Sequence, residues 1–323
     1  MERNIFFDSL KFILIFLVVL GHVMEYDIYD NHLKMSVFSF IYTFHMPLFI
    51  FISGYFSKNL TWEKYKKGFI SLFLVYIVFQ LYYVAIEYIT KGDVDPLSIL
   101  LVPRSVMWYI LGLLLWRFFF CFIPRLKMPF PVLLTASIVI ALVSSFYNDS
   151  NIILKFLHFF PFFIIGYYCN PDIIAKIRGW NKLYMLAISI LVLCGLFIFA
   201  DKWLAFTIFG DFPYSYYPEG YNGIVLKLLT YVLGVVMSVC VINLASDRFH
   251  NLGTKTLAIY LLHPSYVFLY VLVIKSLEIQ LWFILLDFVA AIGIVLLCLF
   301  LYRFKLFQYF VNPIEVVRLI NKK

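Results

Sequence analysis

Charge is scarce in this sequence. Only 14% of its 323 residues are charged, whereas 64% are hydrophobic and 21% are aromatic. Soluble domains have about 45–50% apolar and about 25% charged residues. Too few polar side chains remain to cover a water-exposed surface. The composition therefore excludes an ordinary soluble domain and predicts that lipid surrounds most of the chain.

Disulfide and zinc patterns are lacking too. The five cysteines are odd in number, stand in or beside apolar runs, and show neither disulfide nor zinc spacing, so we interpret them as packing residues. No small-residue cleavage site follows the first apolar run, which we interpret as a retained helix. No connection is long enough for a second folded domain, and no internal repeat supports an inverted-repeat transporter. Residues 1–323 are therefore expected to form a single transmembrane domain.

Apolar runs of about 20 residues, the length that crosses a bilayer as a helix, recur along the whole chain. Prolines and short polar segments separate them. These runs predict an all-α, polytopic membrane protein with about ten transmembrane helices. The predicted spans are 5–24, 36–56, 68–89, 105–123, 130–147, 152–169, 182–200, 222–244, 256–274 and 281–302.

The net charge of +8 comes from lysines and arginines in the short loops between these runs. With the N-terminus inside, the inner segments hold nineteen of the 26 lysines and arginines. This bias predicts that both termini are cytoplasmic. It also accounts for the positive charge without nucleic acid, which we do not expect as a partner. The longest outer connection, about 201–221, is rich in aromatics, Gly and Pro and is expected to cover an outward-facing pocket.

Three ionisable residues interrupt the first apolar run, where each costs a few kcal/mol of insertion energy. They are Asp8, Lys11 and His22. Asp8 and Lys11 are three residues apart, and Lys11 and His22 are eleven apart, close to three helical turns. One stripe of the helix therefore carries all three, with about 16 Å of rise between Lys11 and His22. A structural alternative is a buried Asp8–Lys11 pair with His22 in the outer interface.

Two more histidines stand near the middle of predicted spans. His45 precedes Pro47 by two residues, and His263 is followed by Pro264. A proline leaves backbone carbonyls without their helical partner, which a nearby polar side chain can satisfy. The histidines lie on separate helices and lack the i, i+4 spacing typical of metal-binding pairs, so no metal is expected.

The motifs resemble those of the membrane acyltransferase-3 family. The residues Phe7–Lys11, ten further residues and then His22 resemble the first-helix signature of that family, an Arg or Lys, ten residues and a His. The segment FHMPLFIFISGYF at 44–56 is similar to its second-helix motif, especially in the branch of fucose 4-O-acetylase-like proteins. Weaker similarities lie at Arg104–Tyr109 and Leu252–His263.

The resemblance implies a membrane O-acyltransferase. Such enzymes usually move acetyl from cytosolic acetyl-CoA, a substrate, to a hydroxyl of a cell-surface polysaccharide or lipid-linked sugar. His22 matches the essential histidine of the family and Lys11 its basic position, where Lys replaces the commoner Arg. The family's paired-arginine loop motif is not evident, and only Arg104 stands near its place.

These considerations assign hypothetical roles. Histidine can take a proton near neutral pH, so we expect His22 to be the catalytic base. The donor-binding or supporting residues are expected to be Asp8, Lys11 and Arg104. Trp108 and Tyr109 could stack on a sugar or belong to an interfacial aromatic belt. The candidates for acceptor binding or oxyanion stabilisation are His45, Ser53, Trp108, Tyr109, Tyr260 and His263.

The main alternative is a transporter or flippase for lipid-linked sugars, which would also place polar groups on inward-facing stripes. A glycan polymerase would have a large, arginine-rich outer loop, and a sensor would bind ligand without turnover. The expected partners are the lipid bilayer and a glycan or lipid-linked sugar acceptor, with a homo-oligomer left open. The expected location is the plasma or inner membrane, crossed many times.

Overall fold

A computed structural model describes residues 4–58, 60–92, 95, 98–123, 128–147, 151–277 and 284–320. Within these ranges all regular secondary structure is helical. A long helix corresponds to each of the ten predicted spans, although residues 281–283 of the last lie outside the described residues. The ten helices are α1 (Ile5–Met24), α2 (His32–Tyr55), α3 (Trp62–Lys91), α5 (Met107–Phe120), α6 (Phe130–Tyr147), α7 (Asn151–Tyr168), α9 (Lys182–Phe199), α11 (Gly223–Leu244), α13 (Thr256–Ser276) and α14 (Ile284–Leu301).

Shorter helices lie between and after them. They are α4 (Ser98–Leu101), α8 (Pro171–Arg178), α10 (Lys202–Phe209), α12 (His250–Gly253), α15 (Lys305–Val311) and α16 (Pro313–Ile320).

Eight helices among the described residues are long and apolar enough to cross a membrane. A ninth span results if α7 and α8, which meet at 96°, count as one broken helix. The remaining predicted span, α5, has only 14 residues. The all-α, multi-pass membrane fold is thus confirmed, with α5 shorter than the span predicted at 105–123.

Polar caps fix where several spanning helices begin. The side chains of Asn4, Asn31, Thr61, Asn181 and Asn222 each accept a hydrogen bond from a backbone N–H in the first turn of the helix that follows. Such caps satisfy donors that have no partner within the helix. Each of these helices therefore begins where the sequence supplies a short polar side chain just before an apolar run.

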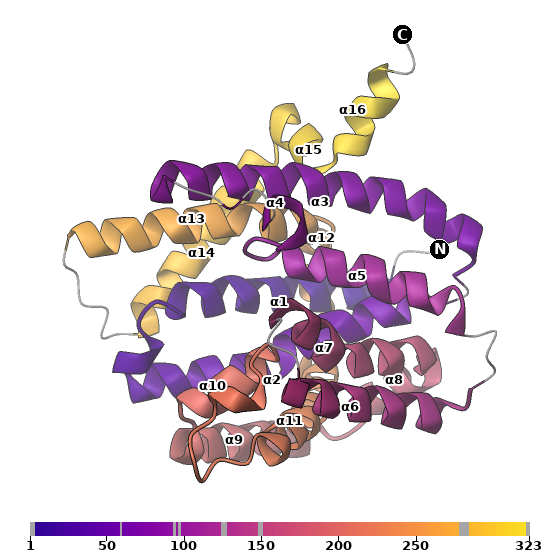
Figure 1. Ribbon diagram of the computed structural model, residues 1–323, viewed down its shortest axis with the longest axis vertical. Helices are drawn as coiled ribbons and strands as arrows, with labels where there is room; N and C mark the ends of the chain where they lie inside the picture. Colours follow the sequence, from indigo (N-terminus) through magenta and orange to yellow (C-terminus); the bar gives the residue numbers. More distant parts are fainter. Residues whose placement is uncertain are drawn as a thin grey trace.

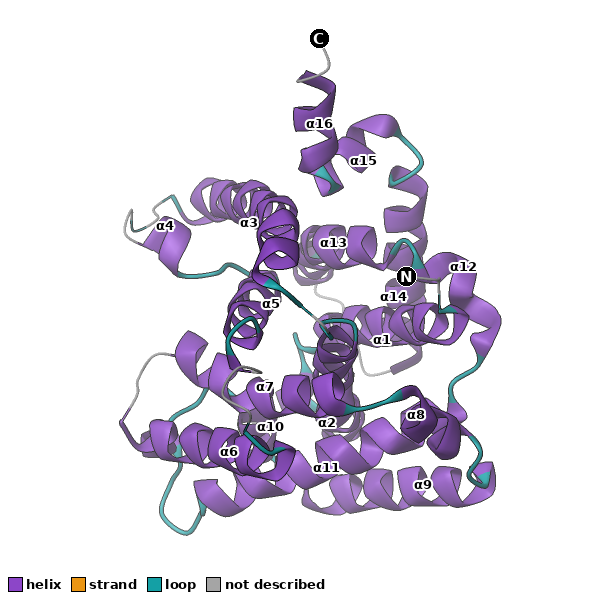
Figure 2. Ribbon diagram, turned by 90° about the vertical axis from the view of Figure 1, so that its right-hand side faces the viewer, coloured by secondary structure: helices purple, strands orange, loops and turns teal. Residues whose placement is uncertain are grey.

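The helices form three layers (Figures 1 and 2). Helices α3 and α13 lie on one side, α6, α9 and α11 lie on the other, and α1, α2, α5 and α7 lie between them. At the C-terminal end, α15 and α16 extend away from these layers. The middle layer therefore places polar residues of α1 and α2 inside the bundle.

Helices α2 and α7 cross in backbone contact. A Cβ added to Gly166 would lie 1.9 Å from the carbonyl oxygen of Phe51, and one added to Gly54 would lie 2.1 Å from the carbonyl oxygen of Phe163. Only glycine permits such an approach. Small residues at crossings are the usual means of close helix packing in membranes.

The loops gather at two ends of the bundle, as the alternation of spans requires. At the predicted inner end, Lys58 donates to the carbonyl of Cys169, and Ser9 donates to that of Ser246. At the predicted outer end, His32 Nε2 lies 2.6 Å from the carbonyl oxygen of Phe197. Which end faces the cytoplasm stays a prediction from charge.

Candidate active site

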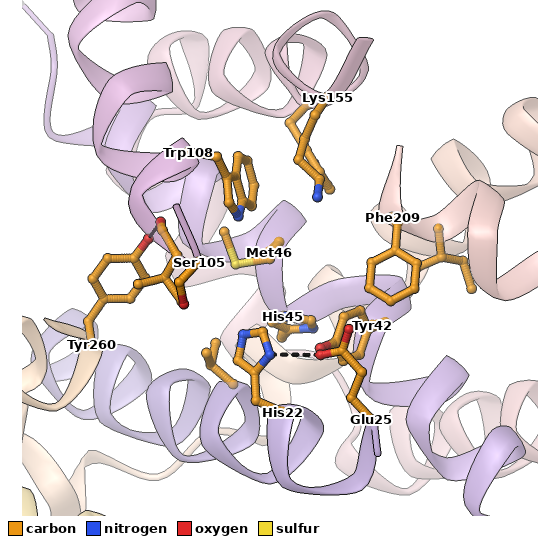
Figure 3. Close-up of a pocket in the computed structure, with 14 residues that line it drawn as sticks. His22, Glu25, Tyr42, His45, Met46, Ser105, Trp108, Lys155, Phe209 and Tyr260 are labelled. Carbon is orange, nitrogen blue, oxygen red and sulfur yellow. Dashed lines mark hydrogen bonds and ion pairs between the residues drawn. The ribbon is translucent and has the colours of Figure 1, made fainter. Parts of the chain in front are cut away.

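His22 lies in the last turn of α1 and lines a cavity between the helices. Its Nδ1 is 3.0 Å from Oε2 of Glu25, the residue that ends the helix (Figure 3). An ionised carboxylate only accepts hydrogen bonds, so Nδ1 carries a proton, and in the neutral imidazole Nε2 then has the lone pair. A carboxylate paired with an imidazole in this way orients the histidine as a general base.

The cavity around His22, here called the outer cavity, has a volume of about 310 Å³. Its wall comes from α1, α2, α5, α7, α10 and α13, together with the loop before α5. The segment 201–221 contributes Ile208 and Phe209, as predicted for a segment that covers a pocket. The lining residues are Val18, His22, Glu25, Tyr42, His45, Met46, Ser105, Val106, Trp108, Lys155, Phe159, Ile208, Phe209 and Tyr260.

The three predicted histidines converge from α1, α2 and α13. The ring centroid of His263 is 5.4 Å from that of His22, and His45 also lines the outer cavity. His45 and His263 are buried, and the Nδ1 of each lies 2.9 Å from the carbonyl oxygen four residues earlier. Each Nδ1 therefore carries a proton, and each Nε2 is an acceptor. No three His, Cys, Asp or Glu residues in the described part of the chain are placed to hold a metal ion.

Gly21 makes room for a tyrosine beside the histidine. A Cβ at this position would lie 2.5 Å from Cε2 of Tyr42. The Tyr42 ring packs 4.4 Å from that of His45, and its hydroxyl has no hydrogen-bond partner although its residue lines the outer cavity. Gly21 thus leaves the space that Tyr42 occupies beside His22 and His45.

A lysine and a tryptophan face His22 across the outer cavity (Figure 3). Lys155 Nζ lies 2.7 Å from Oδ2 of Asp211 and 5.1 Å from the ring centroid of Trp108. Trp108 in turn stacks on Phe159 at 5.3 Å. An aromatic face beside a fixed ion pair offers both a stacking surface and hydrogen-bonding groups.

Glu25 is held ionised by its neighbours. Burial in the protein would raise the pKa of its carboxyl, but the hydrogen bond and charge of His22 and the charge of Lys155 outweigh burial and leave the pKa below its ordinary value of 4.5. About 45% of the side chain is exposed, and the residue lines the cavity. A negative charge therefore stays beside His22 at neutral pH.

A second cavity of about 140 Å³, here called the inner cavity, contains Lys11. Lys11 Nζ lies 2.8 Å from Oδ1 of Asp8, so the predicted pair is present. Ser53 and Tyr109 meet in the same wall with their hydroxyls 2.6 Å apart. Tyr109 is thus on the Lys11 side, whereas its neighbour Trp108 is on the His22 side.

The outer and inner cavities share two wall residues, Met46 and Tyr260. Tyr260 donates its hydroxyl hydrogen bond to the carbonyl of Val106. The predicted stripe of α1 therefore opens into two adjoining spaces, with Lys11 in one and His22 in the other. Met46 and Tyr260 thus stand between the space that contains Lys11 and the space that contains His22.

Arg104 is not placed with Lys11, although the sequence grouped both as donor-binding residues. Its Nε is 2.7 Å from Glu87, near the end of α3, and Nη2 donates to Ser98 Oγ at 2.7 Å. Lys11 instead lies 6.0 Å from the ring of Phe56, the residue that ends α2. Arg104 lines a separate third cavity. Packing thus separates residues that a motif comparison had grouped together.

Sequence reasoning missed Glu25 and Lys155 as site residues. Glu25 follows His22 by three residues, a spacing that places both on one helix face and could have indicated the pair. Lys155 lies within the predicted span 152–169, and an ionisable side chain at such a position could have marked it as a candidate. Only the packing of α7 against α2 and α5 places it in the wall of the cavity.

Comparison with known proteins is decisive for the family. The sequence profile described as an acyltransferase domain matches residues 4–303. The chain belongs to the membrane acyltransferase-3 family. It is therefore a multi-pass membrane acyltransferase.

Two curated relatives are similar to this acyltransferase over short segments. The nodulation protein NolL of Sinorhizobium fredii is 51% identical over 61 residues, which are 18% of this chain and 17% of the relative. That of Mesorhizobium japonicum is 46% identical over 66 residues, 20% of this chain and 18% of the relative. The matched segments thus span less than a fifth of each relative's length. No solved structure matches this acyltransferase.

Proposed function

We propose that this acyltransferase moves an acetyl group from cytosolic acetyl-CoA to a hydroxyl of a cell-surface polysaccharide or lipid-linked sugar in the plasma membrane. The observation that carries the proposal is the pair of adjoining cavities. One contains a basic residue, Lys11, and the other contains a histidine oriented by a carboxylate. A thioester carbonyl at the wall between them would reach the base without a carrier crossing the bundle.

The donor side of the proposal rests on Lys11. A point charge at the predicted cytoplasmic end attracts phosphate groups such as those of CoA. The pantetheine arm would extend along the apolar lining of the inner cavity toward Met46 and Tyr260. The acceptor sugar would lie in the outer cavity against Trp108, with Lys155 and Asp211 within reach of its hydroxyls.

His22 supplies the base in this reaction. Its Nε2 takes the proton of the acceptor hydroxyl as the oxygen forms a bond to the thioester carbon. The resulting tetrahedral intermediate then loses CoA as the C–S bond breaks. The sulfur takes the proton back from the imidazolium, so His22 ends neutral. Glu25 stabilises the imidazolium between these steps.

The negative charge on the carbonyl oxygen needs a hydrogen-bond donor. Tyr260 already donates to a backbone carbonyl, and His45 and His263 donate from Nδ1 to backbone carbonyls and have acceptors at Nε2. Tyr42, whose buried hydroxyl has no hydrogen-bond partner, and Lys155 both line the outer cavity. We assign oxyanion stabilisation to these two residues in preference to Tyr260, His45 and His263, three of the six candidates from sequence.

The test is acetyl transfer in isolated membranes. Membranes containing the protein are incubated with radiolabelled acetyl-CoA, and the polysaccharide and lipid-linked fractions are extracted and counted. We expect His22→Ala to abolish the label, whereas His32→Ala, a histidine outside the cavity, leaves it in place. Equal labelling by wild type and His22→Ala would contradict the proposal. A transporter would bind its sugar but label neither fraction.

A further inference from the structure

A third cavity lies between α3 and α13, beside the outer cavity. Its volume is about 290 Å³. Phe268 and Lys91, both in its wall, are exposed on the protein surface, so the space is a groove on the side of the bundle. The lining residues are Tyr83, Ile86, Glu87, Thr90, Lys91, Arg104, Ser105, Pro264, Ser265 and Phe268.

This lateral groove adjoins the outer cavity at Ser105, which lines both. Ser105 has a φ of 51°, the single positive value for a residue other than glycine in the described part of the chain. Backbone in this region is unfavourable for residues with a side chain and persists where the surroundings enforce it. The strained position coincides with the junction of the two spaces.

A buried glutamine holds the loop that leads to Ser105. Gln80 of α3 donates from Nε2 to the carbonyls of Ile99 and Val102, both at 2.7 Å, and accepts from the N–H of Arg104 at 2.9 Å. Gln80 is eleven residues before the end of α3, which is about 16 Å of helix rise. These hydrogen bonds hold the loop before α5 against α3. Arg104 and Ser105 of this loop form part of the groove wall, and α5 begins only after them.

The groove has one charged corner and an apolar wall. The Glu87 carboxylate forms ion pairs with Arg104, whose Nε is 2.7 Å from Oε2, and with Lys91, whose Nζ is 2.9 Å from Oε1. Two cations therefore share one carboxylate. Ile86, Pro264 and Phe268 supply apolar surface. A net positive corner beside apolar side chains, on an exposed side of the bundle, complements a ligand with both a phosphate and a hydrocarbon chain.

We propose that this groove binds the phosphate and adjoining lipid chain of a lipid-linked sugar, whose glycan reaches over Ser105 into the outer cavity. The inference rests on the proposed transferase function and narrows the acceptor class to a lipid phosphate-linked glycan. Arg104 and Lys91 hold the phosphate, and the chain lies along Phe268 and remains in the bilayer. The acceptor thus approaches from the side of the protein and the donor from its inner end.

Binding of farnesyl diphosphate tests the groove apart from catalysis. The purified full-length protein in nanodiscs is titrated with this probe, and binding is followed by native mass spectrometry. Farnesol has the hydrocarbon chain of the probe without its phosphates, and inorganic diphosphate has the phosphates without the chain. We expect each to bind at least about tenfold more weakly than farnesyl diphosphate, because charge and chain contribute together. Equal binding of farnesol and farnesyl diphosphate would overturn the proposal.

Two variants and a control locate the site. Lys91→Glu, at an exposed position, reverses a charge and should weaken farnesyl diphosphate binding by about tenfold. Thr90→Trp fills the groove and should abolish binding. Lys202→Glu changes a comparable exposed lysine outside the groove and should bind as wild type does. Wild-type binding by both groove variants would place the ligand elsewhere and overturn the inference.

The radiolabel assay separates this inference from the proposed function. Acetyl transfer that depends on His22, without any binding of farnesyl diphosphate, overturns the groove and leaves the transferase. Groove-dependent binding without any acetyl transfer supports the lipid-phosphate site while the proposed function fails.

Discussion

Met46 and Tyr260 each face two cavities, the inner one with Lys11 and the outer one with His22. Tyr260 is held by its hydrogen bond to the carbonyl of Val106. Met46 has an unbranched side chain with three rotatable bonds and no such anchor. Met46 is therefore the part of the wall that is free to move, and in the proposed reaction it would move aside for the thioester of acetyl-CoA.

A bulkier residue at Met46 should close this passage. We expect Met46→Trp to lower acetyl transfer by at least about tenfold, because a rigid ring at the wall misplaces the reacting groups. Acetyl-CoA binding, measured by isothermal titration calorimetry, should change less than about twofold, since in the proposed arrangement the phosphates bind at Lys11 and not at this wall. Met46→Leu, of similar volume, is the control and should keep activity. Equal transfer rates for the Trp and Leu variants would show that the acyl group does not pass this wall.

Removing the charge of Glu25 should slow catalysis. Glu25→Gln keeps a hydrogen-bond acceptor for His22 but no longer stabilises the imidazolium. We expect kcat to fall by about ten- to 100-fold, in the range found for residues that orient a catalytic or ligating histidine. Glu219→Gln removes an exposed carboxylate in the outer loop and should leave kcat unchanged. Similar kinetics for Glu25→Gln and Glu219→Gln would argue against a role for Glu25.

The depressed pKa of Glu25 has a consequence for stability. A carboxyl whose pKa is lower in the folded state contributes stability above its ordinary pKa of 4.5, and this contribution disappears as the pH falls through the lower folded value. We expect the difference in unfolding temperature between wild type and Glu25→Gln to be constant from neutral pH down to about 5 and to shrink below that. Differential scanning fluorimetry over this pH range measures it. A difference that grows toward acidic pH would contradict the sign.

Gly166 is expected to be indispensable for the packing of α2 on α7. An alanine there would place its Cβ 1.9 Å from the carbonyl oxygen of Phe51, so the helices must separate. We expect Gly166→Ala to cost about 2 kcal/mol of folding free energy, a typical cost of overpacking. Gly195→Ala is the matched control, because nothing lies within 4 Å of its added Cβ. Thermal unfolding of both variants in detergent would compare them, and equal stabilities would refute the close crossing.

A buried ion cluster anchors the beginning of α2. Lys34 Nζ lies 2.7 Å from Asp27 and 2.9 Å from Asp287, and the side chains of Lys34 and Asp287 are fully buried. Lys34→Met would leave two carboxylates without their cation, and we expect a loss of about 3–5 kcal/mol in folding free energy.

The exposed pair Lys66–Glu63 provides the comparison for this cluster. Lys66→Met should leave the unfolding temperature almost unchanged, because exposed ion pairs contribute little. Fluorescence-detected thermal unfolding of the two Lys→Met variants measures the difference. A Lys34→Met protein as stable as Lys66→Met would show that the buried cluster is dispensable.

Much of the fold was predictable because a bilayer imposes a local rule. Every backbone N–H and C=O in lipid must be paired within its own segment, so each apolar run of sufficient length becomes a helix. Most of the observed helices begin and end close to the predicted boundaries, but α3 begins at Trp62, where Thr61 caps it, and not at 68. The departures have local causes. Helix α2 begins at His32 and not at 36 because Lys34 is paired and buried, and α5 begins at Met107 because Gln80 holds the loop before it.

The sequence alone determined the membrane class, the helices and the common stripe of Asp8, Lys11 and His22, since helical periodicity fixes which residues of one helix share a face. Only the tertiary structure decided that His22 and Lys11 open into separate cavities, that Arg104 belongs to a lateral groove, and that Lys155 faces His22. These relationships depend on how helices rotate and slide against one another. Close contacts between distant segments, such as Gly166 against Phe51, set that arrangement, and no periodicity within a single helix encodes it.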